Sequence, residues 1–292
     1  MQEIAPQVYI EDRYPGVVLG LLVMAQGSLL IDSPPCPDSA RSWKNALRAF
    51  NGRGPNQVLI YLDHHPDRCL GGRHFSNTIV AHEHAAAVFS ERPNLFRSQT
   101  ANRGENWELC PSVQGVRWGQ PNVFFSDTIS FHWDPDPVTA FYRGGVSPSA
   151  IWVIWPSRRV LFVGDTVTSR EPPFLAEADL PTWEANLDEL ATKYADYRIV
   201  GSRDGVLRLG QILSFRDWLH QIHEELRKAR ARRLAPADVA RKMTEAHLPR
   251  WVHPNLDPAR QRLYRQRLLY GFEQAYQNLK GRRGPRKRRR KS

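Results

Sequence analysis

A short stretch of the sequence, Tyr61 to Gly72, gathers the side chains best suited to chemistry. It reads Y-L-D-H-H-P-D-R-C-L-G-G and follows an apolar run, Val58 to Ile60, that predicts a buried strand. Asp63, His65 and Asp67 alternate along it, and residues two apart on an extended backbone can point the same way. Two carboxylates and an imidazole that converge are suitable donors for a divalent metal ion.

This stretch resembles the H-x-H-x-D-H loop of the metallo-β-lactamase family, in which a glycine pair follows the loop. Here the pattern is D-x-H-x-D-R, so His65 and Asp67 match and the glycine pair is present. Asp63 and Arg68 stand where the first and last histidines of the family belong. The loop therefore resembles the family's motif with two of its ligand positions altered.

Other landmarks of the family follow in the same order. An early strand pair ends at Asp32, and R-V-L-F-V-G-D-T-V places Asp165 where the family has its bridging carboxylate. Two further ligand histidines are replaced, because the aligned positions hold Val146 and Ser202. Valine offers no lone pair to a metal, and the guanidinium of Arg68 stays protonated at any working pH.

The resemblance implies a zinc centre, but the altered residues leave room for at most one ion. We expect Arg68 to replace the second metal by pairing with Asp67 and Asp165. Asp63, His65 and Asp165 then form the predicted metal site. Two outcomes stay open: the site holds one zinc, manganese or iron(II) ion, or it holds no ion. The alternative is structural: Asp67 caps the following helix and His65 is a hydrogen-bonded core histidine.

Two functions stay open at this point. The first is a hydrolase of an ester, a thioester or a related small substrate, in which one metal lowers the pKa of a bound water. Asp67, Arg68 and Ser202 are its predicted catalytic residues, with Arg68 or Ser202 stabilising the oxyanion. The alternative is a catalytically inactive pseudoenzyme that binds a small ligand, a partner or nucleic acid.

Short apolar runs that alternate with helical patterns predict the α/β body that must position these residues. The resemblance implies a four-layer αββα sandwich for residues 1–206. An amphipathic pattern with Ile212, Phe215 and Leu219 on one side begins a predicted helical C-terminal extension over residues 207–279. An extension of this kind often shapes the substrate pocket or a dimer contact, and a homodimer is one alternative for the oligomeric state.

Residues 280–292 form a basic tail with nine Lys or Arg and no acid, which we expect to be disordered. Without the tail the formal charge of the 292-residue chain would fall from +11 to +2. Such a run contacts RNA or DNA non-specifically, or simply aids solubility.

Three scattered cysteines, Cys36, Cys69 and Cys110, predict reduced thiols rather than a disulfide framework. No apolar run is long enough to span a membrane, and the early apolar segment is not a signal peptide. The sequence therefore predicts a cytoplasmic protein that makes no membrane contact.

Overall fold

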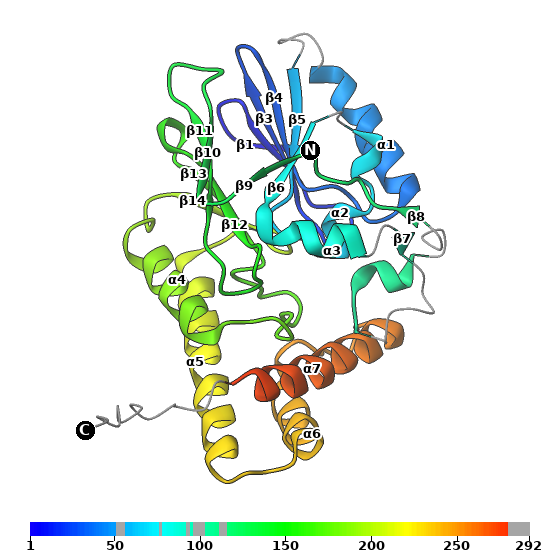
Figure 1. Cartoon of the computed structure of the whole chain (residues 1–292), viewed down its shortest axis with the longest axis vertical. Coiled ribbons are helices and arrows are strands. Elements are labelled where there is room, and N and C mark those ends of the chain that lie inside the picture. The colour runs from blue at the N-terminus through cyan, green and yellow to red at the C-terminus, as the bar shows by residue number, and fades with distance from the viewer. Residues whose placement is uncertain (51–55, 76–77, 92–93, 96–102, 111–115, 280–292) are drawn as a thin grey trace, which may run out of the picture.

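Two sheets packed face to face form the body of the protein, as the computed structural model in Figure 1 shows. The structure describes residues 1–50, 56–75, 78–91, 94–95, 103–110 and 116–279. Helices cover the outer face of each sheet, so the predicted four-layer αββα sandwich is confirmed.

The first sheet has the strand order β1-β2-β3-β4-β5-β6-β9, and the second runs from β10 to β15 in sequence order. The strands of the first sheet are β1 Gln2–Ala5, β2 Val8–Glu11, β3 Leu19–Met24, β4 Gly27–Ile31, β5 Asn56–Ile60, β6 Thr78–His82 and β9 Val123–Phe125. Those of the second are β10 Thr128–Phe131, β11 Val138–Tyr142, β12 Ile151–Trp155, β13 Val160–Gly164, β14 Arg198–Gly201 and β15 Gly205–Val206. A separate pair is formed by β7 Asn94–Leu95 and β8 Val116–Arg117.

Seven α-helices lie within the part of the chain that the structure describes. They are α1 Pro37–Leu47, α2 Pro66–Cys69, α3 Ala86–Glu91, α4 Leu180–Thr192, α5 Leu209–Ala231, α6 Pro236–His247 and α7 Pro258–Asn278. Proline at the first or second position of five of them fits these starts, because its missing N–H is not needed there.

Three apolar layers separate the sheets and helices, and the alternation of side chains along the strands accounts for them. In β4, Leu29 and Ile31 point between the two sheets, whereas Leu30 points outward to α1 and its Trp43. The third layer joins the outer face of β12 and β13 to α4, α5, α6 and α7. The C-terminal helices share this layer with α4. The domain boundary that the sequence predicts between residues 206 and 207 therefore stays a prediction.

Strand direction brings the chemistry-bearing loops to one place. β4, β5 and β6 are parallel neighbours in the first sheet, and β13 and β14 are parallel neighbours in the second. Asp32 follows β4, the motif loop follows β5, Asp165 follows β13 and Ser202 follows β14. The carboxyl ends of these strands therefore present all of these residues on the same edge of the sandwich.

One prediction about the cysteines is wrong. Cys36, just before α1, and Cys110 form a disulfide with their Cα atoms 6.1 Å apart, and Cys69 is a buried free thiol. The two cysteines are 74 residues apart, and only the packing of the α1 start against the segment around Trp107 brings them together. Sequence spacing does not contain that information.

The remaining predictions about the chain have mixed outcomes. The predicted strand over Val58 to Ile60 lies within β5, and the amphipathic pattern at Ile212, Phe215 and Leu219 lies within α5, so both are confirmed. In the described part of the chain, no helix combines the length and apolarity required to cross a bilayer. The basic tail, residues 280–292, lies outside the described residues, and the cytoplasmic location stays a prediction.

Candidate functional site

Arg68 lies at the centre of the strand-end cluster, and its side chain is fully buried. Its Nε is 3.2 Å from Oδ1 of Asp63, and its Nη2 is 2.6 Å from Oδ2 of Asp165. On the other side, Nη1 lies 3.4 Å from Oγ of Ser202 and 3.8 Å from Oδ2 of Asp32. The guanidinium therefore ties together the ends of four strands.

A second buried arginine, Arg203, completes the arrangement. It donates from Nε and Nη2 to the two carboxylate oxygens of Asp165, each at 3.0 Å, in a bidentate pair. Its Nη1 also contacts Asp67 at 3.1 Å and Glu171 at 2.7 Å. The prediction that Arg68 pairs with Asp67 is therefore wrong: Arg68 pairs with Asp63 and Asp165, and Arg203 pairs with Asp67.

Asp67 joins the motif loop to the segment around Asn106. Its Oδ1 accepts the backbone N–H of Trp107 at 2.8 Å, and its Oδ2 accepts from the backbone and side chain of Asn106, both at 3.2 Å. The helix cap considered for Asp67 belongs instead to His65, whose Nδ1 accepts the Asp67 N–H at 3.2 Å. Asp67 thus serves long-range packing.

Glu171 and Arg267 extend the network to the C-terminal helix α7. Arg267 Nη1 is 3.1 Å from Oε2 of Glu171 and donates to the carbonyl of Pro172 at 2.8 Å. Its Nε donates to the carbonyl of Gly104 at 2.7 Å. Sequence reasoning missed Arg203, Glu171 and Arg267, because their partners lie far away along the chain.

The electrostatics of the cluster follow from these contacts. Burial opposes ionisation of Asp165, but the guanidinium groups of Arg203 and Arg68 outweigh it and hold its pKa below the ordinary value. Burial, with the positive charge of Arg203, holds the pKa of His65 well below its usual range. His65 is therefore neutral, and because Nδ1 accepts a hydrogen bond, its proton resides on Nε2.

The residues present do not fit the metal centre that the fold family implies. The carboxylates of Asp63, Asp67 and Asp165 each form an ion pair with a guanidinium, whose fixed charge repels a cation placed beside it. Val146 is buried and supplies no donor. Within the described ranges, no three His, Cys, Asp or Glu side chains are arranged to hold a metal ion.

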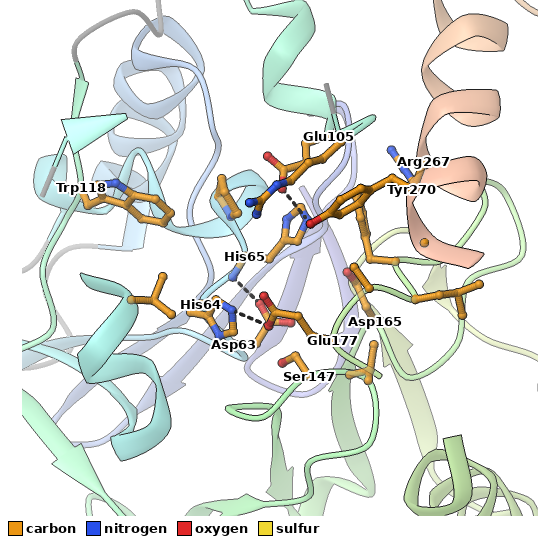
Figure 2. Close-up of a pocket in the computed structure, with 18 of the residues that line it drawn as sticks. Asp63, His64, His65, Glu105, Trp118, Ser147, Asp165, Glu177, Arg267 and Tyr270 are labelled. Atoms are coloured by element: carbon orange, nitrogen blue, oxygen red, sulfur yellow. Dashed lines mark hydrogen bonds and ion pairs between the residues drawn. The ribbon is translucent and has the colours of Figure 1, made fainter. Parts of the chain in front are cut away.

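A cavity of about 140 Å³ lies in front of the cluster (Figure 2). Its lining includes Asp63, His64, His65, Arg103, Glu105, Trp118, Val146, Asp165, Phe174, Leu175, Glu177, Arg267 and Tyr270. All three predicted metal ligands, Asp63, His65 and Asp165, are therefore on its wall. The predicted catalytic residues Asp67, Arg68 and Ser202 do not line it and are almost fully buried behind it.

His64, the residue between two predicted ligands, makes the most distinctive polar contact of the wall. Its Nε2 is 3.0 Å from Oε2 of Glu177, and its Nδ1 is 2.6 Å from Oγ of Ser149 (Figure 2). Burial opposes its protonation, but Glu177 outweighs burial and raises the pKa of His64. Ser149 itself is fully buried, so it orients the ring and is not exposed to a ligand.

Two carboxyl groups near the cluster are held partly protonated by their surroundings. Burial, reinforced by the charge of Asp67, raises the pKa of Glu105 to about 7 although Trp107 Nε1 donates to it. Burial likewise raises the pKa of Asp32 to about 7, against the opposing effect of Arg68. Each group therefore resists losing its proton up to neutral pH.

Comparisons with known proteins agree with this architecture. The model of the metallo-beta-lactamase superfamily matches residues 20–237. A search of curated protein sequences finds no match.

Among solved structures, the sec-alkylsulfatase Pisa1 from Pseudomonas sp. is 15% identical with a TM-score of 0.69, covering 95% of this chain and 49% of its own. A metallo-beta-lactamase family protein from Thermus thermophilus is 18% identical with a TM-score of 0.62, covering 94% and 93%. A metallo-beta-lactamase from Pontibacter korlensis is 19% identical with a TM-score of 0.54, covering 75% and 97%. The chain spans about half the length of the alkylsulfatase, and identities this low indicate a shared fold alone.

Proposed function

The chain belongs to the metallo-beta-lactamase superfamily, and we propose that this member uses the superfamily's pocket to bind a small molecule without a metal ion. In this proposal the hydrolase-like fold is retained as a binding scaffold, and the protein is a pseudoenzyme with respect to metal-dependent hydrolysis. The arginine–carboxylate network takes over the structural part that metal ions play in such a centre, which is to hold several acidic side chains close together.

The observation that carries the proposal is the environment of Asp165. The residue stands where the family has its bridging carboxylate, and all of its contacts above are with the guanidinium groups of Arg68 and Arg203. Each guanidinium supplies several N–H donors in a rigid plane and cannot lose its charge. A cation that displaced them would separate two buried arginines from the carboxylate that they share, which is strongly unfavourable.

The cavity supports the binding part of the proposal. It combines apolar side chains with polar and ionisable ones, and apolar surface with placed polar groups is typical of a small-molecule site. Trp118, Phe174, Leu175 and Tyr270 supply aromatic and aliphatic surface, and His64 and Glu177 supply polarity.

The hydrolase hypothesis is the second candidate. One observation favours it, namely that Asp63, His65 and Asp165 all line the same cavity. Alkylsulfatase and metallo-beta-lactamase are the names of the proteins with similar structures, and they assign no substrate to this chain.

Elemental analysis of the full chain, purified without added metal or chelator, tests the two candidates against each other. We expect far less than one ion per chain, and no change in melting temperature when zinc or a chelator is added. A stoichiometric ion that disappears in Asp63→Ala and His65→Ala, but stays in the exposed control His253→Ala, would instead establish the hydrolase's metal site. A screen of small molecules by calorimetry then identifies the ligand of the metal-free protein.

A further inference from the structure

The polar groups of the cavity wall are unevenly satisfied. Among the described residues, four enclosed nitrogen atoms on this wall have no hydrogen-bond partner: Nη2 of Arg267, Nε2 of His65, Nε of Arg103 and Nε1 of Trp118. All four carry protons, because two belong to guanidinium groups, one to an indole, and the fourth to an imidazole whose other nitrogen accepts a hydrogen bond. Buried donors without acceptors are rare in folded proteins, so these four point to a missing acceptor.

The carboxylate groups described on the same wall already have partners. Asp63 accepts from the His65 backbone N–H at 2.7 Å in addition to its pair with Arg68. Asp165 is held by two guanidinium groups, and Glu177 pairs with His64. Glu105 accepts from the indole N–H of Trp107, and its Oε1 lies 3.8 Å from Nε2 of His65, beyond hydrogen-bond distance. Among the enclosed polar atoms of the wall without a partner, only Oγ of Ser147 can accept, in the part of the chain that the structure describes. Free donors therefore outnumber free acceptors there, and a ligand that brings acceptors satisfies more of them.

We propose that the cavity binds a small carboxylic acid in its ionised form, with the carboxylate accepting from Arg267 and His65. This assignment rests on the proposed function, because a metal ion at Asp63, His65 and Asp165 would occupy the same space. Arg267 is suited to the task because its side chain is fully buried and its Nε and Nη1 are fixed by Gly104, Pro172 and Glu171. One edge of the guanidinium is thereby oriented before any ligand arrives, and charge-assisted hydrogen bonds from arginine to carboxylate are strong.

The rest of the cavity indicates the body of the ligand. The ring of Phe174 lies 4.1 Å from the centre of the His65 ring, and the guanidinium of Arg267 lies 4.1 Å above the same phenyl ring. Trp118 and Leu175 continue the apolar surface. A dry cavity of ~150 Å³ accommodates benzene, so the space of about 140 Å³ suits an acid with a single ring or a short chain.

The free donors of the wall give the ligand one direction. Glu177, Asp63 and Asp165 line the cavity, but each pairs with a cationic side chain. The unpartnered Nη2 of Arg267 and Nε2 of His65 therefore set the place of the carboxylate, and the apolar body of the ligand is left to Phe174 and Trp118.

Isothermal titration calorimetry of the full chain with benzoate, benzamide and benzylamine tests the assignment on the wild-type protein alone. We expect benzoate to bind about tenfold more tightly than benzamide, because a charge-assisted hydrogen bond replaces a neutral one. Benzylamine, which offers only donors, should give no binding heat. Equal or tighter binding of benzamide or benzylamine would overturn the carboxylate assignment while leaving a metal-free binding site in place.

Two variants and one control locate the contact. Arg267→Lys keeps the charge and loses the planar edge, and we expect benzoate to bind at least about tenfold more weakly. Arg265→Gln removes an exposed arginine of the same helix and should leave the affinity unchanged. If Arg267→Lys does not fold, as judged by circular dichroism, His65→Gln provides the second test.

Three results would end the proposal in different ways. Unchanged benzoate affinity in a folded Arg267→Lys or His65→Gln protein would exclude the proposed carboxylate contact, and so would the absence of benzoate binding by the wild type. A stoichiometric metal ion in the purified chain would overturn the metal-free function and this assignment together.

Discussion

Two kinds of arginine–carboxylate pair occur in this protein, and they differ chiefly in exposure. At the strand ends, the side chains of Arg68, Arg203 and Asp165 are 0%, 1% and 2% exposed. On the C-terminal helices, the pair Arg241–Asp238 is 67% and 69% exposed. Solvent screens the exposed pair and has little access to the buried pairs, so equal geometry does not mean equal energy.

The two kinds also differ in what they connect. The exposed pair spans three residues of one helix, α6, and fixes nothing outside it. The buried pairs join residues that follow β5, β13 and β14, and through Glu171 and Arg267 they reach α7. The buried pairs therefore help to set the shape of the cavity, whereas the pair on α6 does not.

Removal of Arg203 should have the largest effect. Arg203→Met leaves Asp165, Asp67 and Glu171 buried with one cation fewer, and breaking a buried pair costs about 3–5 kcal/mol of unfolding free energy. Urea denaturation followed by fluorescence measures the loss. A loss below about 1 kcal/mol, typical of an exposed pair, would show that burial is not the feature that separates the two kinds.

A charge-preserving variant sharpens that measurement. Arg203→Lys keeps the positive charge but cannot make the bidentate contact with Asp165. We expect it to be intermediate between the wild type and Arg203→Met. Equal losses in the two variants would assign the whole effect to geometry and none to charge.

From the sequence, the positions of the functional residues along the chain could be predicted. The side chains with which they pair could not. The strand ends before Asp63, Asp165 and Ser202 could be predicted from apolar runs and turn residues. The sequence also shows directly that other residues replace the ligand histidines of the family. The prediction paired Arg68 with Asp67, because both stand in one motif. The partner of Asp67 is Arg203, which a different strand of the other sheet delivers.

The same limit explains the residues that sequence reasoning missed. His64 stands at an unspecified position of the motif, and only Glu177, on a distant loop, gives it a role. Arg267 is one of many arginines on α7, and nothing in the helical pattern distinguishes it. Burial selects it, and burial depends on how α7 packs beside Gly104.

The ionisation of Glu105 should have the next largest effect on stability, and this effect depends on pH. Its pKa rises from 4.5 to about 7 in the folded protein, so the unfolded chain loses the proton first as the pH increases. The contribution of Glu105 therefore lowers stability progressively between pH 4.5 and 7, by about 3 kcal/mol in total. Glu105→Gln, which retains an acceptor for Trp107, should remove this slope.

Thermal denaturation across that pH interval measures the difference between Glu105→Gln and the wild type. The stabilisation of the variant should grow with pH and level off above about 7. A constant difference would mean that the carboxyl group ionises normally and that its buried setting has no energetic effect.

The pair of His64 and Glu177 is intermediate in exposure between the buried and the exposed arginine–carboxylate pairs. His64 is buried and Glu177 is half exposed. The pKa of His64 is raised above 6.5 and that of Glu177 is lowered below 4.5. The pair therefore stabilises the fold across the interval between these values and fades as the pH rises through the folded pKa of His64. Solvent screening at Glu177 limits the gain to about 1 kcal/mol.

Glu177→Gln tests that intermediate position. NMR titration should show a lower pKa for His64 in the variant, and the stability loss should be present at about pH 6 and small at high pH. An unchanged pKa of His64 in the variant would mean that this pair contributes as little as an exposed pair.

The smallest effect is expected on the helix surface. Arg241→Ala removes the pair with Asp238, and an exposed pair within one helix contributes about 0.5 kcal/mol or less. Urea denaturation at low and high salt measures it, and the small loss seen at low salt should vanish at high salt because screening has already removed the interaction. The salt response of Arg203→Met should by contrast be weak, since its partners are out of reach of the solvent. If Arg241→Ala instead cost as much as Arg203→Met, the stability of this fold would not depend on where its arginines are buried, and the arginine network could not be regarded as the replacement for a metal centre.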